Sequence, residues 1–146
     1  ELIQSYINPK DLKNCEIISD DKIKSHILKK SIFAVAKSGT VSLEICNAKI
    51  PSIILYKMGV INFFIIKKLV KTKFANIINI AAREEVIPEL LQSNCNSRNI
   101  FNKTSFYLDN PSKIKDQIDR TQAIISKLRT DQSPTELAAK SLIRYL

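Results

Sequence analysis

A short apolar run that leads into a glycine-containing turn constrains the fold of this chain more than any other feature. Residues 32–36 are continuously apolar, and the sequence SGTVSLE follows at residues 38–44. A continuous apolar run of this length predicts a parallel strand that is buried on both faces. The apolar period then changes to that of a helix, whose inner side is expected to hold Val41, Leu43, Ile45 and Ala48. We therefore expect a strand-to-helix junction with Ser38, Gly39 and Thr40 in the first helical turn.

The start of this helix is a candidate anion site. Backbone N–H groups in a first helical turn have no partner within the helix and carry partial positive charge. An anionic oxygen can therefore bind at Ser38, Gly39 and Thr40 without a lysine. Glu44 lies one turn further on and is expected to lean back toward the same opening, where it can accept hydrogen bonds from sugar hydroxyls. An ordinary capped helix, which Ser or Thr commonly begins, is the alternative interpretation.

The order of the expected elements indicates an α/β fold. Residues 15–18 have the composition of a strand, and residues 20–30, which begin with two aspartates, fit a capped helix. Pro51 precedes a second apolar run at residues 53–56. Alternation of strands and helices with short connections favours βαβ units. We predict an α/β fold with a Rossmann-like parallel sheet and flanking helices.

Two segments are expected at the carboxyl ends of neighbouring strands. One is the turn at residues 38–40, and the other is the pair Tyr56-Lys57, which ends the second apolar run. Ligands of open parallel sheets bind beyond the carboxyl ends of the strands. The two segments are therefore predicted to line one ligand crevice.

The second half of the chain is predicted to be mainly helical. Residues 74–78 fit a further strand that ends at Asn79, and residues 85–92 fit a short helix or two turns around Pro88. Longer helical segments are expected at residues 97–108, 111–128 and 133–146. The middle one carries an amphipathic stripe made of Ile114, Ile118, Ile125 and Leu128. We predict a sheet domain at residues 1–110 and a helical tail at 111–146, packed on that domain or on an amino-terminal domain outside this sequence.

The chain is strongly basic, with a formal net charge of +9 at pH 7. No acidic residue occurs between Glu44 and Glu84, and the basic residues in that interval are Lys49, Lys57, Lys67, Lys68, Lys71, Lys73 and Arg83. This distribution predicts that the middle of the chain faces an anion. A nucleic acid is a weaker candidate than a phosphorylated substrate, because most aromatic residues lie in apolar runs and not at stacking spacing.

The segment Val60–Val70 is the most apolar part of the chain. It is too short to span a bilayer, which needs roughly 20 apolar residues. A core helix that covers the sheet is the favoured interpretation. The alternative is an interfacial helix whose aromatic residues lie among lipid headgroups and whose flanking lysines are attracted to anionic lipid.

The cysteine and histidine content argues against several kinds of chemistry. Cys15, Cys46 and Cys95 lie far apart without a CxxC pair, and His26 is the single histidine. A structural zinc site is therefore not expected, and neither is a histidine-activated nucleophile. We expect no metal and no cofactor, three buried or half-buried cysteines in a reducing cytoplasm, and a surface or packing role for His26 rather than a catalytic one.

Several motifs in register resemble the carboxyl-terminal part of the lipid-A-disaccharide synthase family. They are SGTVSLE, PSIILYK at residues 51–57, the apolar segment that ends in KKLVK, Asn79, and PELLQ at residues 88–92. The similarity runs from about Phe33 to about Cys95. It implies the donor half of a two-domain GT-B glycosyltransferase that is cytoplasmic and membrane-associated. Since the sequence begins with Glu1 in what reads as the middle of an element, we expect an excised domain or a fragment.

The resemblance implies a site for UDP-2,3-diacylglucosamine, whose sugar the family transfers to the lipid-linked acceptor 2,3-diacylglucosamine 1-phosphate with release of UDP. The implied donor-binding residues are Ser38, Gly39, Thr40, Glu44, Tyr56, Lys57, Asn79 and Arg83. The first three would hold the diphosphate, and Glu44 would accept the ribose hydroxyls by analogy with related UDP-sugar transferases. Tyr56-Lys57 stands where the family usually has Tyr-Arg, so the positive charge remains but the planar fork is lost.

The chain departs from the family pattern after Asn79. Where the family typically has Ala-Gly followed by a basic residue, this chain has Ala82-Arg83-Glu84. Either Arg83 reaches the anion one position early or the site has decayed. The family's acceptor site and its acidic base lie in an amino-terminal domain, so we assign no catalytic residue here. We expect this part to bind donor or UDP better than it turns it over; a non-catalytic remnant and a basic anion-binding module are the alternatives.

Overall fold

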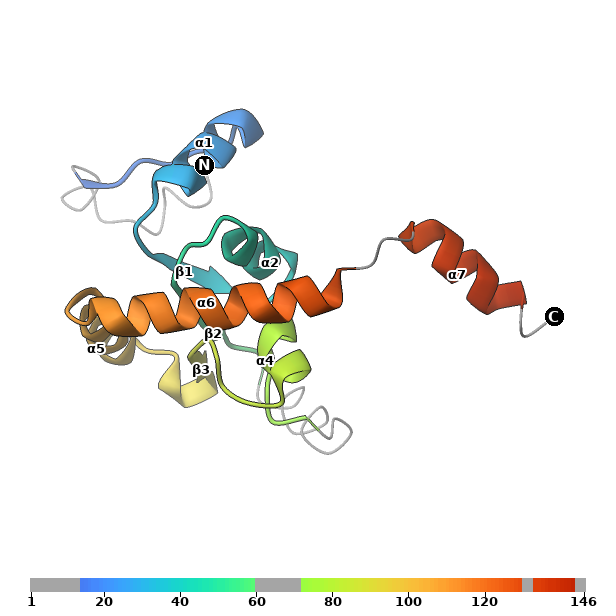
Figure 1. Cartoon of the computed structure of the whole chain (residues 1–146). Helices are drawn as coiled ribbons and strands as arrows, with labels where there is room; N and C mark the ends of the chain where they lie inside the picture. The colour runs from blue at the N-terminus through green and yellow to red at the C-terminus, as the bar shows by residue number, and fades with distance from the viewer. Residues whose placement is uncertain (1–13, 60–71, 130–132, 144–146) are drawn as a thin grey trace. The chain divides into compact units, whose positions relative to one another are not determined.

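A computed structural model of the chain describes residues 14–59, 72–129 and 133–143 (Figure 1). The chain divides into two compact units, residues 1–30 and residues 31–146. The predicted segment Val60–Val70 lies outside the described residues.

Helix α1, Asp21–Lys30, lies in the first unit and confirms the helix that the sequence predicts there. Asp20 caps it, because its Oδ1 accepts the backbone N–H groups of Lys22 at 2.7 Å and Ile23 at 3.0 Å. His26 is exposed on this helix, which agrees with the predicted surface role.

The predicted strand at residues 15–18 is wrong. These residues lie in the first unit and form no strand, and Cys15 and Ile17 are exposed. A strand needs a neighbour that accepts and donates its backbone hydrogen bonds, and every strand of the described residues lies in the second unit. The expectation that Cys15 is buried fails for the same reason.

Three parallel strands form the sheet of the second unit, in the order β1-β2-β3. Their bounds are Ala34–Lys37 for β1, Ser52–Tyr56 for β2 and Glu89–Leu91 for β3. Helix α2, Thr40–Asn47, connects β1 to β2. The predicted α/β class, with a Rossmann-like parallel sheet and flanking helices, is confirmed.

The two apolar runs are buried to different extents because the two strands occupy different places in the sheet. In the central strand β2, Ile53 and Ile54 are completely buried, as predicted. β1 lies at an edge of the sheet, and its Val35 is 46% exposed. Ile32 precedes the strand and is 76% exposed. The prediction that the run at residues 32–36 is buried on both faces is therefore wrong.

Helix α2 follows β1 as predicted and buries Ile45 as predicted, but it begins at Thr40, so Ser38 and Gly39 precede its first turn. Ser42, Ile45 and Cys46 are its buried residues, whereas Val41 is 40% exposed. These three positions lie on one helical face at spacings of three and four residues. A buried serine is possible here because its hydroxyl donates to the Gly39 carbonyl oxygen at 2.6 Å.

Residues 74–92 contain the largest departures from the sequence-based expectations. The strand predicted at residues 74–78 is wrong, because helix α4, Ile77–Ala82, begins there. Asn76 caps α4 by accepting the N–H of Ile78 at 2.9 Å. Of the two alternatives predicted at residues 85–92, the short helix is wrong, because this stretch contains β3.

Contacts of residues 86–91 with the core explain why Glu89–Leu91 form a strand. Val86, Ile87 and Leu90 are buried, and the Pro88 carbonyl oxygen accepts the N–H of Ile54 at 2.9 Å. Proline has no N–H to donate but keeps its carbonyl acceptor, so it can precede a strand that pairs with β2.

The longer helices of the second half confirm their predictions. The described elements after β3 are η3 at Gln92–Asn94, α5 at Ser97–Leu108, α6 at Pro111–Leu128 and α7 at Pro134–Ile143. Proline is the first residue of both α6 and α7, where its missing N–H needs no partner.

Helix α6 crosses the second unit and packs against α2, α4 and α5 (Figure 1). Its buried residues are Gln117, Thr121 and Ile125. The predicted apolar stripe is therefore wrong at Leu128, which is 49% exposed. Polar residues of α6 are buried because this helix forms hydrogen bonds to backbone groups of the sheet layer as well as packing on apolar side chains.

Hydrogen bonds from α6 reach both β2 and α2. The Gln117 side chain accepts the N–H of Ser52 at 2.7 Å and donates to its carbonyl oxygen at 3.0 Å. Gln122 donates to the carbonyl oxygen of Cys46 at 2.6 Å, near the end of α2. Since these contacts join residues more than sixty positions apart, α6 is an integral part of the second unit.

Helices long and apolar enough to cross a membrane do not occur among the residues that the structure describes.

Candidate functional site

The carboxyl ends of β1 and β2 lie side by side because the two strands are parallel neighbours. Lys37 is paired with Leu55, and the next N–H, that of Ser38, donates to the Leu55 carbonyl oxygen at 3.2 Å. The structure therefore brings the turn at residues 38–40 and the pair Tyr56-Lys57 to the same end of the sheet, where ligands of open parallel sheets bind.

Gly39 begins α2 in a backbone conformation that is almost restricted to glycine, with φ 157° and ψ −167°. As the N-cap residue without a side chain, it supplies no side-chain acceptor to the N–H groups of the first turn. A Cβ at this position would meet no atom within 4 Å, so the space beside the turn is open. Backbone donors beside open space are the arrangement that an anionic ligand needs at a helix start.

Ser38 holds the turn in place with both of its donors. Its backbone N–H is bound to Leu55, and its hydroxyl donates to the Ala75 carbonyl oxygen at 2.7 Å. Neither donor of Ser38 is therefore directed at the space beside Gly39. Any direct contact with an anion falls mainly to Gly39 and Thr40.

Thr40 and Glu44 lie one helical turn apart on α2, and both side chains are exposed. Residues four positions apart share a helix face, and side chains lean toward the amino-terminal end of the helix. The Glu44 carboxylate thus stands on the same side of α2 as the opening at Thr40.

The segment after β2 is held by Gln92. Its side-chain Oε1 accepts the N–H of Met58 at 2.8 Å, and its Nε2 donates to the Met58 carbonyl oxygen at 3.2 Å. This pair of bonds continues the ladder between β2 and β3 beyond Tyr56 and Leu91, which are the last paired residues. Lys57 is exposed between Tyr56, which is paired with β3, and Met58, which is bound by Gln92, so its backbone is held on both sides.

Asn79 lies in α4 with a completely buried side chain. Its Oδ1 accepts the N–H groups of Val86 at 2.8 Å and Ile87 at 2.9 Å. Its Nδ2 donates to the Ile87 carbonyl oxygen and to Glu89 Oε1, both at 2.7 Å. An amide side chain has two donor hydrogens and two acceptor positions, and all four are used by the chain itself. Asn79 therefore holds the segment 86–89 in place and has no donor or acceptor left for a ligand.

Arg83 ends α4 in the left-handed conformation, with φ 59° and ψ 21°, and its side chain is exposed. This conformation favours glycine, the residue that the resemblance implies at this position, because a Cβ clashes with the backbone in it. The arginine is accommodated, since its N–H still donates to the Ile80 carbonyl oxygen at 3.3 Å.

Arg83→Gly is expected to raise the free energy of unfolding by about 1 kcal/mol, because glycine adopts the left-handed conformation without the penalty of a Cβ. Chemical denaturation followed by circular dichroism would measure the change. Ala82→Gly, one residue earlier and inside the helix, is the matched control and should lower stability by roughly 0.5–1 kcal/mol. A loss of stability in Arg83→Gly would contradict the strain assigned to this position.

Glu84 is bound to α6. Its carboxylate forms an ion pair with Arg120 at 2.8 Å, and Arg120 also lies 3.8 Å from Asp116. The hydrogen bond that Arg120 donates to the Glu84 carboxylate is the main cause that raises the pKa of Arg120. Glu84 therefore joins the α4–β3 connection to α6.

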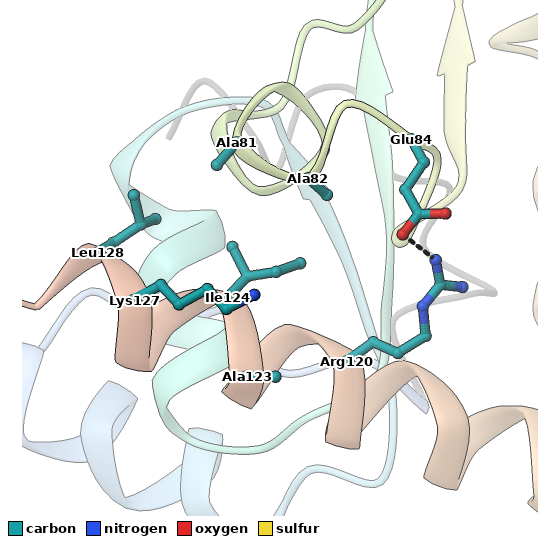
Figure 2. A pocket seen from close by; sticks show the side chains of 8 residues that line it. All are labelled: Ala81, Ala82, Glu84, Arg120, Ala123, Ile124, Lys127 and Leu128. Atoms are coloured by element: carbon teal, nitrogen blue, oxygen red, sulfur yellow. Dashed lines mark ion pairs between the residues drawn. The ribbon is translucent and has the colours of Figure 1, made fainter.

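A pocket of about 320 Å³ lies between α4 and α6, beside this ion pair (Figure 2). Its lining residues are Ala81, Ala82, Glu84, Arg120, Ala123, Ile124, Lys127 and Leu128. None of the predicted donor-binding residues belongs to this lining, so the pocket is separate from the turn at Gly39.

Two free cysteines of the second unit, Cys46 and Cys95, are described by the structure. Burial raises the pKa of the Cys46 thiol to about 11, so this cysteine stays protonated and weakly nucleophilic at neutral pH. Cys95 is half-buried, as predicted. Within residues 14–59, 72–129 and 133–143, no three His, Cys, Asp or Glu side chains are grouped so that they could hold a metal ion.

Sequence reasoning gave no role to Ala75, Glu89 or Gln92, which hold the two segments of the site in place. Glu89 and Gln92 belong to the PELLQ motif, so the motif drew attention to the right residues. Their roles could not be found from the sequence, because their side-chain partners lie 10 to 34 positions away.

Comparisons with known proteins agree with the motif pattern. The family model for lipid-A-disaccharide synthetase matches residues 3–142. Lipid-A-disaccharide synthase of Rickettsia typhi is 40% identical over 129 residues, which cover 87% of this chain and 33% of that protein. The enzymes of Rickettsia felis and Rickettsia prowazekii are 39% and 38% identical and are also covered to 33%. The chain thus spans about a third of the length of the curated relatives it matches. It belongs to the lipid-A-disaccharide synthetase family.

Proposed function

We propose that this chain is the part of a lipid-A-disaccharide synthase that binds the nucleotide-sugar donor, UDP-2,3-diacylglucosamine. The observation that carries the proposal is the turn at Gly39. It combines a glycine-only conformation, the amino-terminal end of a helix and open space at the carboxyl end of a parallel sheet. In a member of this family, a diphosphate is the anion that fits such a turn.

Each part of the donor has a proposed partner. The diphosphate binds the start of α2 at Gly39 and Thr40. Ser38 holds this turn through its hydrogen bonds to Leu55 and Ala75. The Glu44 carboxylate accepts the ribose hydroxyls, because it stands one turn along the same face of the helix. Lys57 and Arg83, both exposed, supply positive charge to the phosphates as single charged groups.

The complete reaction needs more than this chain provides. The whole protein would transfer diacylglucosamine to 2,3-diacylglucosamine 1-phosphate, release UDP and so build the disaccharide of lipid A. The attacking hydroxyl needs a base, and we propose that the base and the acceptor site belong to the part of the relatives' length that this chain does not span. The reaction would take place on the cytoplasmic face of the inner membrane, where exposed lysines such as Lys49, Lys57 and Lys73 are attracted to anionic lipid.

UDP is expected to bind this chain weakly, and Glu44→Ala is expected to weaken that binding about tenfold, because a hydrogen bond to a charged group is lost. Isothermal titration of UDP into both proteins measures the change. Uridine should lose affinity to a similar degree, since Glu44 is assigned to the ribose and not to the phosphates.

Glu136→Ala is the matched control, because Glu136 is an exposed carboxylate on α7 and its loss changes the net charge equally. UDP affinity should be the same in this variant as in the wild type. No detectable UDP binding to the wild-type chain, or equal weakening by both substitutions, would refute the proposed donor site.

A further inference from the structure

Three backbone and side-chain donors converge on the carboxylate of Glu89, a half-buried residue of β3. Its Oε2 accepts the N–H of Ala75 at 2.7 Å. Its Oε1 accepts the N–H of Asn76 at 2.9 Å and the Nδ2 of Asn79 at 2.7 Å. A carboxylate is the side chain that fits these partners, because it accepts hydrogen bonds at both oxygens and offers no donor that would oppose them.

Ala75, which Glu89 holds, is the residue that holds the turn of the candidate site. The N–H of Ala75 is bound to Glu89, and the carbonyl oxygen of Ala75 accepts the hydroxyl of Ser38 at 2.7 Å. Ser38 is also bound through its N–H to Leu55 of β2. The residue before Gly39 is therefore fixed at two points, one on the sheet and one on the segment before α4.

These contacts form a closed ring. β1 is paired with β2, β2 is paired with β3, and Glu89 of β3 returns through Ala75 to Ser38 at the end of β1. Because Gly39 follows Ser38 directly, the direction of the Gly39 and Thr40 N–H groups depends on where Ser38 is held. A side chain in the third strand thereby sets the geometry of a turn after the first strand.

We propose that Glu89 is a positioning residue of the donor site, which orients the phosphate-binding turn at Gly39 through Ala75 and Ser38. The inference rests on the proposed function, because it assigns the diphosphate to this turn. Glu89 itself does not touch the ligand in this scheme. A carboxylate that only stabilised the start of α4 would make the same three hydrogen bonds. Only a signal from the turn at Gly39 itself therefore distinguishes the two roles.

Selective ¹⁵N-glycine labelling provides that readout, because the chain contains only two glycines, Gly39 and Gly59. In the ligand-free protein, Glu89→Gln should shift the amide signal of Gly39 and leave that of Gly59 in place. The substitution keeps the size of the side chain but sets an NH₂ group against one of the three donors. Glu85→Gln is the matched control, since the exposed Glu85 lies four residues earlier and its carboxylate makes one long bond of 3.3 Å to the Glu89 N–H.

Binding measurements with two probes test the consequence for the phosphates. Glu89→Gln should weaken UDP binding on the order of tenfold while changing uridine binding less than about twofold, since the turn contacts the diphosphate alone. If Glu89 only stabilised the fold, Glu89→Gln would weaken the binding of UDP and of uridine equally. Ser38→Ala combined with Glu89→Gln should be no worse for UDP than either single variant, because both break the same connection.

The outcomes separate the two proposals. If the Gly39 signal of the wild type does not respond to UDP, the donor site is wrong, whatever Glu89 does. If it responds to UDP but is unchanged in a folded, ligand-free Glu89→Gln variant, the positioning role is wrong. Should Glu89→Gln not fold, Ser38→Ala tests the same connection from its other end: amide hydrogen exchange at Ala75 should accelerate while Val86 stays protected, and unchanged exchange at Ala75 would overturn the role.

Discussion

Asn79→Ala is expected to lower the free energy of unfolding by about 3–5 kcal/mol, a large fraction of the stability of an ordinary domain. The side chain is completely buried and makes four hydrogen bonds, all to the segment 86–89. Alanine would leave the N–H groups of Val86 and Ile87 buried without an acceptor. Each buried donor that loses its partner costs about 1–3 kcal/mol, and the effects overlap because they lie in one network.

The loss at Asn79 should also reach the candidate site. Without the Asn79 amide, Glu89 Oε1 loses one of its hydrogen-bond donors. The connection between α4 and β3 also loses its hydrogen bonds to the Asn79 side chain. Urea denaturation followed by circular dichroism measures the stability change. Asn102→Ala is the control, because Asn102 is exposed on α5 and alanine favours a helix; it should change stability by less than about 0.5 kcal/mol. A similar small change in Asn79→Ala would contradict the structural role given to this residue.

Gln117→Ala is expected to cost about 2–4 kcal/mol, because it removes both bonds that join α6 to the first residue of β2. Gln117 is 3% exposed and Ser52 is 1% exposed, so water cannot replace the lost partner. The N–H and the carbonyl oxygen of Ser52 would both remain buried and unpaired. The truncated side chain would also leave a cavity beneath α6.

Two further substitutions separate these contributions. Gln117→Met fills the space without the polar atoms, so it should recover the cavity part of the loss and none of the hydrogen-bond part. Gln122→Ala removes one bond from a half-buried side chain on the same helix and should cost about 1 kcal/mol. Thermal denaturation of the three variants gives the comparison. Equal losses of stability in Gln117→Ala and Gln122→Ala would contradict the role given to the two hydrogen bonds between Gln117 and Ser52.

The core of the candidate site follows from local sequence signals. The apolar run before Gly39, the change of period after it and the second run after Pro51 identify one strand–helix–strand unit, and the structure contains it as β1, α2 and β2. Two parallel neighbours must end at the same side of the sheet. The proximity of Ser38–Thr40 to Tyr56-Lys57 could therefore be predicted without any tertiary contact.

The segment around α4 and β3 could not be predicted in this way. Phe74 to Ile78 has a strand-like composition, but the cap at Asn76 and the carboxylate of Glu89 stabilise a helix start there. Residues 85–92 look helical, but Ile54 offers its N–H to Pro88 and Leu90 has a buried place beside β2. Tertiary hydrogen bonds and burial outweigh weak local propensities.

The sequence by itself determined the α/β class, the glycine at the strand-to-helix junction and the helices α1, α5, α6 and α7, because caps, turn residues and apolar periods act over a few positions. Only the tertiary structure decided which side chains remain available to a ligand. Asn79 and Ser38 read as ligand-binding residues in the sequence, yet their donors are bound within the chain by residues up to 37 positions away. A hydrogen bond satisfies a donor wherever its partner lies in the sequence, so the partner becomes visible only once the chain is folded.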